Sequence, residues 1–189
     1  MPYPAKTDRQ TILNAALDQV SREGMQGMSL RGVATALDLA PTALYRYFAD
    51  RATLESAINA ETANRLHAAM KKAVGKKDAV AAIRATAQAY LRFAREHRNL
   101  YELLMSPCHP CVEDLPTHQQ LWDFVIEQVA RVSSREHANE AAVALWAHLH
   151  GIAAFEAAHV FGEQKPSRGF DFGLEAWLQA AQAASHKKT

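Results

Sequence analysis

A short stretch near the N-terminus concentrates side chains that can read DNA. Pro41 is followed by Thr42 and Ala43, which offer a hydroxyl, a methyl and a small apolar surface. Such groups hydrogen-bond to base edges in the major groove or pack against a thymine methyl. Arg46, in the same stretch, can make an ionic contact with a phosphate. These residue types predict a DNA-reading element.

Two helices and a tight turn are needed to present these side chains. In the run SLRGVATALDLAPTALYRYFA, Ser29 can cap one helix and Pro41 can open the next. Asp38 lies where the chain must turn. Leu44 and Phe48, four residues apart, predict the face that anchors the second helix. The pattern is typical of a helix-turn-helix unit, whose second helix enters the major groove.

Helices are also predicted on both sides of this unit. Thr7, with Gln10 three residues later, predicts the cap of a first helix that ends at Gly24. Asp50 predicts the cap of a long helix that ends at Gly75. Apolar residues at helical spacing predict five further helices, the first of them capped by Asp78, over about 78–94, 100–105, 117–132, 141–161 and 174–181.

The composition agrees with an all-α protein of about nine helices. Hydrophobic residues make up 49% of the chain, whereas there are only 8 glycines and 7 prolines. The formal charge of +1 is too small to indicate DNA binding, so that prediction depends on the motif. No apolar run approaches the roughly 18 residues of a membrane span. We expect a cytoplasmic protein without a membrane partner.

The first 55 residues resemble the N-terminal domain of the TetR family of transcriptional regulators. The matching segments are ILNAALDQVSREG, SLRGVATAL, ALYRYF and ADRATL. Asp38 departs from the family pattern, which usually has glycine in the turn. Further along, LWAHLHGIAAFE resembles the C-terminal domain of a TetR subgroup with a Trp-x-x-x-His-Gly signature, here Trp146, His150 and Gly151.

The resemblance implies a domain organisation and a set of DNA contacts. It implies a helix-turn-helix domain over 1–53, a fourth helix over about 51–74 that bridges the domains, and an effector-binding and dimerisation domain over 54–189. Tyr45, Tyr47 and Arg51 match positions that usually touch the phosphate backbone or neighbouring bases. The DNA-binding candidates are Arg31, Pro41, Thr42, Ala43, Tyr45, Arg46, Tyr47 and Arg51.

These candidates have structural alternatives. Tyr45 could pack between helices, because tyrosine rings are often half-buried. Arg46 could be a solvated surface charge. Arg31 could form an ion pair with Asp38 or Glu23.

The resemblance also implies a homodimer on a pseudo-palindromic operator with half-sites about 34–36 Å apart, or a multiple of that spacing. We expect the helix over 141–161 and the last helix to form the interface, because the first of these is apolar almost all round. The alternative is that both helices belong to the intramolecular core. The interface candidates are Gly151, Ala154, Ala158, Leu174, Trp177, Leu178 and Ala181.

A small apolar or amphipathic effector is the other implied partner, and no cofactor is expected. The later helices carry aromatic, aliphatic and histidine side chains in the mixture typical of a ligand pocket, which is also typical of any helical core. The pocket candidates are Tyr90, Phe93, His97, Tyr101, Leu104, Trp122, Val125, His148 and Phe155.

One pair of cysteines suggests different chemistry. Cys108, His109 and Cys111 have a C-x-x-C spacing that could bind zinc or sense oxidants. A structural zinc site usually needs a second ligand pair, and no nearby lysine or arginine would lower a thiolate pKa. We therefore expect no metal here, with a metal- or redox-responsive regulator as the alternative.

No catalytic motif is recognisable. The chain has no G-x-S-x-G, H-E-x-x-H, Walker or dinucleotide-binding glycine pattern. A helical enzyme, or an adaptor that does not bind DNA, would leave the polar surface around Thr42 without a purpose. The sequence predicts a transcriptional regulator of the repressor type, not an enzyme.

Overall fold

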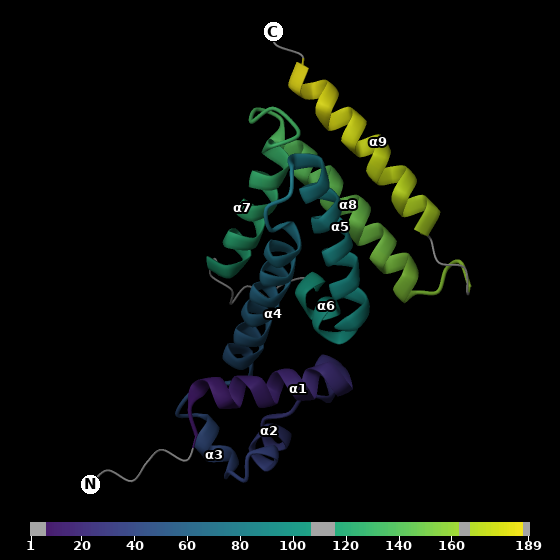
Figure 1. Ribbon diagram of the computed structural model, residues 1–189. Helices are drawn as coiled ribbons and strands as arrows, with labels where there is room; N and C mark the ends of the chain where they lie inside the picture. The colour runs from purple at the N-terminus through teal and green to yellow at the C-terminus, as the bar shows by residue number, and fades with distance from the viewer. Residues whose placement is uncertain (1–6, 107–115, 163–166, 187–189) are drawn as a thin grey trace. The chain divides into compact units, whose positions relative to one another are not determined.

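The computed structural model describes residues 7–106, 116–162 and 167–186, and every regular element in these ranges is a helix (Figure 1). The all-α prediction is confirmed. No helix in the described ranges is long and apolar enough to cross a membrane. The helices are α1 (Arg9–Gly27), α2 (Leu30–Ala36), α3 (Pro41–Leu44), α4 (Arg51–Val74), α5 (Ala79–Glu96), α6 (Arg98–Met105), α7 (Pro116–Ala130), α8 (Ala138–Ala157) and α9 (Ser167–His186).

The chain divides into two compact units. One comprises residues 1–63 and 97–117, and the other comprises residues 64–96 and 118–189. Helix α4 is continuous and contributes its N-terminal part to the first unit and its C-terminal part to the second. Within the first unit, α6 packs against α1. The domain boundary expected near residue 53 stays a prediction.

The first unit has one apolar core, built from α1 to α4 with Leu100 of α6. An apolar stripe along the first helix is buried, as are Leu44 and Phe48, the two predicted anchors of the short third helix. The fully or nearly fully buried side chains of this core include Ile12, Leu13, Ala16, Leu17, Val20, Met28, Val33, Ala34, Leu44, Phe48, Leu54 and Ile58.

The first helix begins one residue later than the sequence predicted. Asp8 caps α1, because its Oδ1 atom accepts a hydrogen bond from the Thr11 backbone N–H at 2.7 Å. The predicted cap, Thr7, is therefore wrong, and Gln10 donates to Asn14 Oδ1 instead of completing a capping box. An ionised carboxylate is the stronger acceptor for an unpaired N–H at a helix start.

The other predicted ends are closer to the structure. Asp50 and Asp78 accept from the backbone N–H groups of Thr53 and Ala81, at 2.7 and 2.8 Å, so both predicted caps are confirmed. Gly24 has a φ of +72°, but one further helical turn follows it, and α1 ends at Gly27.

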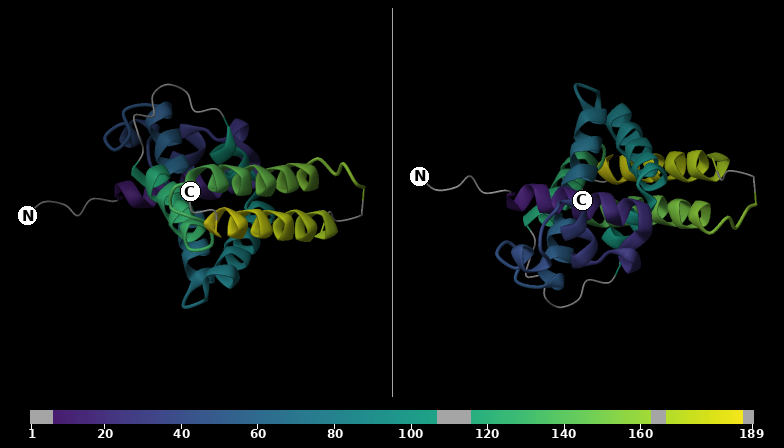
Figure 2. Two further views of the ribbon diagram at one scale, coloured as in Figure 1. Left: turned by 90° about the horizontal axis from the view of Figure 1, so that it is seen from above. Right: turned by 90° about the horizontal axis from the view of Figure 1, so that it is seen from below.

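The second unit contains α5, α7, α8, α9 and the end of α4. Helices α8 and α9 lie side by side (Figure 2). The indole Nε1 of Trp177 in α9 donates to the Ala141 carbonyl of α8 at 2.9 Å. Arg95 of α5 makes two hydrogen bonds of 2.6 Å to the Glu156 carboxylate of α8. Helix α8 ends at Ala157, four residues before the predicted end.

Candidate nucleic-acid interface

The turn before α3 fixes the direction of the predicted DNA-reading helix. Ser29 caps α2 by accepting from the Gly32 backbone N–H at 3.0 Å. At the other end of α2, the Leu39 N–H donates to the Ala34 carbonyl at 2.9 Å and the Asp38 N–H donates to the Thr35 carbonyl at 3.2 Å. These two bonds form a Schellman motif. Its left-handed position is occupied by Asp38, with a φ of +53°.

Helix α3 is short and is held by apolar anchors on one side. Pro41 occupies its first turn, where a missing N–H costs nothing. Leu44 and Phe48 are each only 1% exposed, so the predicted anchoring is confirmed. Burial of that face leaves Pro41, Thr42 and the two residues after Leu44 exposed.

The sequence-predicted contact residues therefore differ in exposure. Tyr45 is 53% exposed, so the alternative that it packs between helices does not describe this structure. Arg46 and Thr42 are exposed, whereas Ala43 and Tyr47 are partly buried. The exposed side chains around α3 form a surface that a DNA groove could contact.

Tyr47 is tied to the start of the chain. Its hydroxyl donates to the Thr7 carbonyl oxygen at 2.8 Å. The bond joins residues 40 positions apart, so no local pattern could have predicted it. It fixes the ring between α3 and the residue before the α1 cap.

Arg51 is held by two bonds within the first unit. Its Nε donates to the Glu55 carboxylate at 2.5 Å and its Nη2 donates to the Met25 carbonyl at 3.1 Å. The N-terminus of α4 is capped within the chain, because the Asp50 carboxylate accepts a hydrogen bond from the Thr53 backbone N–H. The hydrogen bonds from the Thr53 backbone N–H and hydroxyl lower the pKa of Asp50.

Gln19 is a positioning residue that the sequence analysis missed. Its side-chain amide donates to Glu23 at 3.2 Å and to the Gly27 carbonyl at 3.3 Å, and its Oε1 lies 3.5 Å from the Ser29 N–H. A Cβ atom on Gly32 would lie 2.6 Å from the Gln19 Nε2 atom, so glycine allows this close packing. A polar residue beside the apolar stripe of α1 was the available clue.

Arg31 lies near this junction. It is exposed and lines a groove between α1 and α2 together with Gln19 and Arg22. Glu23, one of its two proposed ion-pair partners, accepts a hydrogen bond from Gln19.

The predicted effector residues fall in both compact units, and the predicted pocket stays a prediction. His97, Tyr101 and Leu104 belong to the first compact unit, and the other six belong to the second. Tyr90 and Val125 are buried at 0% and 1% exposure, and Phe93 is also buried, whereas Phe155 is 47% exposed.

Within the second unit, aromatic contacts account for part of this set. Trp146 packs edge-on against both Tyr90 and Trp122, with ring centroids 4.9 and 5.9 Å apart. His148 stacks on Phe170 of α9, and its Nε2 atom lies 3.2 Å from the Phe170 carbonyl oxygen. His148 therefore joins α8 to α9.

The predicted interface residues fall into two groups. Leu174, Leu178 and Ala181 of α9 are buried within the chain. Trp177, also in α9, is half-buried and donates a hydrogen bond to α8. Ala154 and Ala158 are exposed, and a Cβ atom on Gly151 would meet no atom within 4 Å. The α9 members therefore pack inside the chain, while the α8 members leave a face uncovered.

The cysteine loop lies outside the described residues, so Cys108, His109 and Cys111 stay predictions. Among the residues that the structure describes, no three His, Cys, Asp or Glu side chains are grouped closely enough to hold a metal ion.

Comparisons with known proteins agree with this fold. The family described as "Bacterial regulatory proteins, tetR family" matches residues 12–58, and the "Tetracyclin repressor-like, C-terminal domain" matches residues 83–177. Among curated proteins, none is similar enough to the chain to match.

Several solved structures share the fold over nearly the whole chain. A protein of unknown function from Rhodococcus sp. RHA1 is 24% identical, with a TM-score of 0.81 over 96% of this chain and 99% of that chain. A TetR transcriptional regulator from Streptomyces coelicolor is 19% identical, with a TM-score of 0.72 over 95% and 100% of the two chains. A TetR variant from Acinetobacter baumannii AYE in complex with minocycline is 19% identical, with a TM-score of 0.70 over 96% and 99%.

The two family matches extend over the helix-turn-helix unit and most of the helices that follow α4. The chain belongs to the TetR family of bacterial transcriptional regulators, which are DNA-binding proteins and not enzymes.

Proposed function

We propose that this regulator is a cytoplasmic repressor that binds a pseudo-palindromic operator as a homodimer and is released by a small molecule. The observation that carries the proposal is the exposure of Thr42, Tyr45 and Arg46 on a helix whose opposite side is anchored by Leu44 and Phe48. An anchored helix with a polar outer face is what a major-groove reader requires.

The residues around α3 divide into base-reading and phosphate-binding roles. Thr42 and Ala43, in the first turn of α3, are the proposed base contacts, with Pro41 setting the direction of that turn. Arg31, Arg46 and Tyr45 are the proposed phosphate contacts. Tyr47 donates its one hydroxyl proton to Thr7, so its proposed role is to hold the end of the DNA-reading segment in position. Phosphate contacts fix the register of the protein on DNA, whereas base contacts select the sequence.

Arg51 suits a phosphate-binding role because its guanidinium is already held in place. The bonds to Glu55 and Met25 use two of its five N–H donors and leave others for a phosphate. A side chain held in one rotamer before binding loses less entropy when the complex forms.

Two copies are proposed because one module of this kind buries too little surface for tight, selective binding. The uncovered face of α8 supports a dimer: Val143 is 52% exposed, Ala147 and Ala154 are exposed on the same helix, and Ala158, directly after the helix, is exposed too. Gly151 is not required by packing within the chain, so its lack of a side chain suits close approach of a partner helix. The exposed side of α9, with Phe172 79% exposed, adds to this proposed interface.

The effector is proposed to act through α4, which is continuous between the two compact units. A ligand that favours one position of α4 would change the spacing of the two α3 helices in the dimer. A coupling of about 1–3 kcal/mol would change operator affinity by about 5–150-fold.

A reporter gene tests the repressor role. An operator recovered by selection from random DNA is placed across a promoter, and reporter output is compared with and without the regulator. Compared with cells that lack the regulator, we expect lower reporter output with the wild-type chain and the same output with the Thr42→Arg variant. Higher output with the wild-type chain would show an activator and overturn this part of the proposal.

A further inference from the structure

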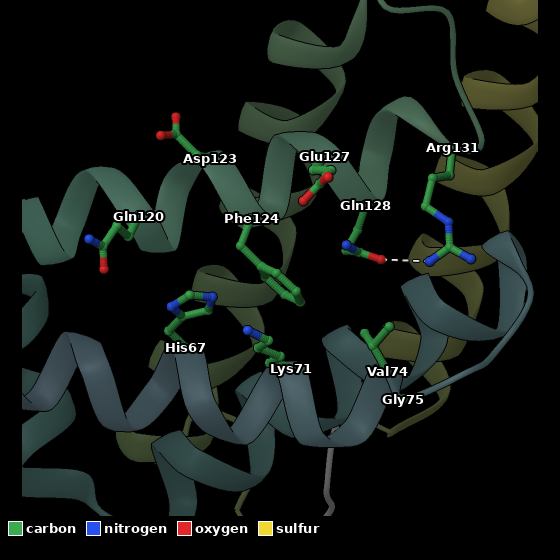
Figure 3. Close-up of a pocket in the computed structure, with 10 residues that line it drawn as sticks. All are labelled: His67, Lys71, Val74, Gly75, Gln120, Asp123, Phe124, Glu127, Gln128 and Arg131. Carbon is green, nitrogen blue, oxygen red and sulfur yellow. Dashed lines mark hydrogen bonds between the residues drawn. The ribbon is translucent and has the colours of Figure 1, made fainter.

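A pocket of about 630 Å³ lies between the C-terminal half of α4 and α7 (Figure 3). None of the residues predicted for the effector lines it. Its volume is within the range of pockets that hold small organic ligands, about 300–1,000 Å³. All of its lining residues belong to the second compact unit.

An aromatic side chain and two nitrogen-bearing side chains meet in this pocket. His67 of α4 and Phe124 of α7 point toward one another, with ring centroids 5.0 Å apart and planes tilted by 52° (Figure 3). Lys71, one turn after His67, extends its ammonium group into the same space (Figure 3). The arrangement combines a flat apolar surface with a positive charge.

The positive charge of Lys71 acts electrostatically on His67. Burial lowers the pKa of His67, and the nearby Lys71 ammonium lowers this pKa further. A neutral imidazole beside an ammonium offers N–H donors from both groups. Together they can hold a carboxylate in charge-assisted hydrogen bonds.

The other charged groups of the lining are partly engaged. Asp123 accepts a hydrogen bond from Gln119 at 2.7 Å, and its carboxylate points away from α4 (Figure 3). Arg131 donates to Gln128 and to the Lys77 carbonyl, at 2.7 and 2.8 Å, and closes one end of the pocket.

Glu127 also lines the pocket and favours a cationic ligand. The position of the basic groups favours an anionic ligand over a cationic one, because Lys71 and His67 flank the aromatic ring on which a ligand would pack. The two possibilities give opposite results with ligands of opposite charge.

We propose that this pocket binds a small aromatic carboxylate, whose ring packs on Phe124 and whose carboxylate bonds to Lys71 and His67. Its occupation would bias the position of α4 against α7. The effect on DNA rests on the proposed function, whereas binding to the free protein does not.

Isothermal titration of the DNA-free protein tests the pocket with cinnamate, neutral cinnamamide and cationic cinnamylamine. We expect cinnamate to bind at least tenfold more tightly than either analogue, since a charged hydrogen bond contributes about 1.5–3 kcal/mol. Tighter binding of cinnamylamine, or no binding of cinnamate, would overturn the proposal.

Matched variants locate the site. Lys71→Gln should weaken cinnamate binding about tenfold, and Phe124→Leu should also weaken it. Lys71→Arg should restore most of the affinity, which excludes misfolding as the cause. Lys72→Gln removes the exposed neighbouring charge outside the pocket lining and should leave affinity unchanged. Equal losses in the Lys71→Gln and Lys72→Gln variants would contradict the assignment.

A separate DNA measurement distinguishes the two proposals. If cinnamate binds in titration and lowers operator affinity, both proposals are supported. If cinnamate binds while operator affinity is unchanged, the proposed ligand site is supported and its proposed role as an effector site is contradicted.

Discussion

The hydroxyl of Tyr47 donates a hydrogen bond to the backbone carbonyl oxygen of Thr7 at 2.8 Å, joining the end of the DNA-reading turn to the residue before the α1 cap. This bond uses the one hydroxyl proton of Tyr47, so the residue positions the DNA-reading segment and does not donate to a phosphate. It also makes the geometry of α3 depend on a segment 40 residues away.

Replacing Tyr47 with phenylalanine removes this bond. We expect the free energy of unfolding to fall by about 0.5–1.5 kcal/mol, the usual contribution of one hydrogen bond. DNA affinity should fall for all sequences alike, because the bond positions α3 and makes no contact with a base. Urea unfolding and fluorescence anisotropy measure the two effects. Tyr45→Phe, at an exposed position, should keep wild-type stability, and a wild-type result for Tyr47→Phe in both assays would contradict the account.

Asp38 occupies a left-handed position at which glycine has no steric penalty. Asp38→Gly should raise the free energy of unfolding by about 0.5–1 kcal/mol, because it removes a Cβ atom that is unfavourable in this conformation. Asp38→Ala should lower it, because alanine keeps the Cβ atom and loses the short polar side chain that makes the left-handed conformation easier for aspartate. Thermal and urea unfolding provide the measurement. Destabilisation by glycine would show that the aspartate side chain contributes more than the backbone preference.

Thr42 and Arg46 should give different binding defects. Thr42→Val removes the hydroxyl and should change the preferred base at one operator position, with a discrimination of about 1–3 kcal/mol. Arg46→Ala should weaken binding to all sequences and reduce the slope of log affinity against log salt by about one. Competition against single-base operator variants, repeated at several salt concentrations, separates the two. An unchanged base preference in Thr42→Val would contradict its assigned role.

The cap of α4 predicts a dependence of stability on pH. The Thr53 backbone N–H and hydroxyl lower the pKa of Asp50 below its ordinary value of 3.8. The unfolded chain therefore takes up the proton first, so the stabilisation is present above pH 3.8 and is lost as the pH falls through the folded-state pKa. Asp50→Asn keeps an acceptor that does not titrate and should flatten this part of the curve. Urea unfolding between about pH 6 and pH 3 measures it; parallel curves for the two proteins would refute the prediction.

The proposed dimer can be broken on α8. Ala154→Arg places a charge on the exposed face and should give a monomer in light scattering at concentrations where the wild type is a dimer. Operator affinity should fall by at least about tenfold, because the two half-sites are no longer bound by linked modules. Gln119→Arg, at an exposed position on α7 outside the proposed interface, is the control and should stay dimeric. A dimeric Ala154→Arg variant would remove α8 from the interface.

The parts of the first unit that depend on neighbouring residues were predictable. Ser29 and Pro41 act on the first turns of their own helices, and Leu44 and Phe48 lie four residues apart on one buried face, so residue type and helical spacing were enough. The α1 cap was misplaced by one residue because Thr7 and Asp8 are both good caps, and only the backbone geometry distinguishes them.

Contacts between distant segments were not predictable. No spacing rule connects Tyr47 with Thr7, or Gln19 with the Ser29 turn. Likewise, the apolar stripe at Leu174 and Leu178 revealed that α9 buries a face, but periodicity does not say which helix covers it. The structure shows that α8 of the same chain lies against α9.

The most direct test of operator recognition is the selection of bound sequences from a random DNA pool. We expect an enriched pseudo-palindrome with half-site centres about 34–36 Å apart or a multiple of that spacing, occupied by two copies of the chain. Its affinity should fall steeply with salt, and Thr42→Val should enrich a different base within each half-site. Failure of the wild-type chain to enrich any sequence, or enrichment of a site that one copy saturates, would contradict this expectation.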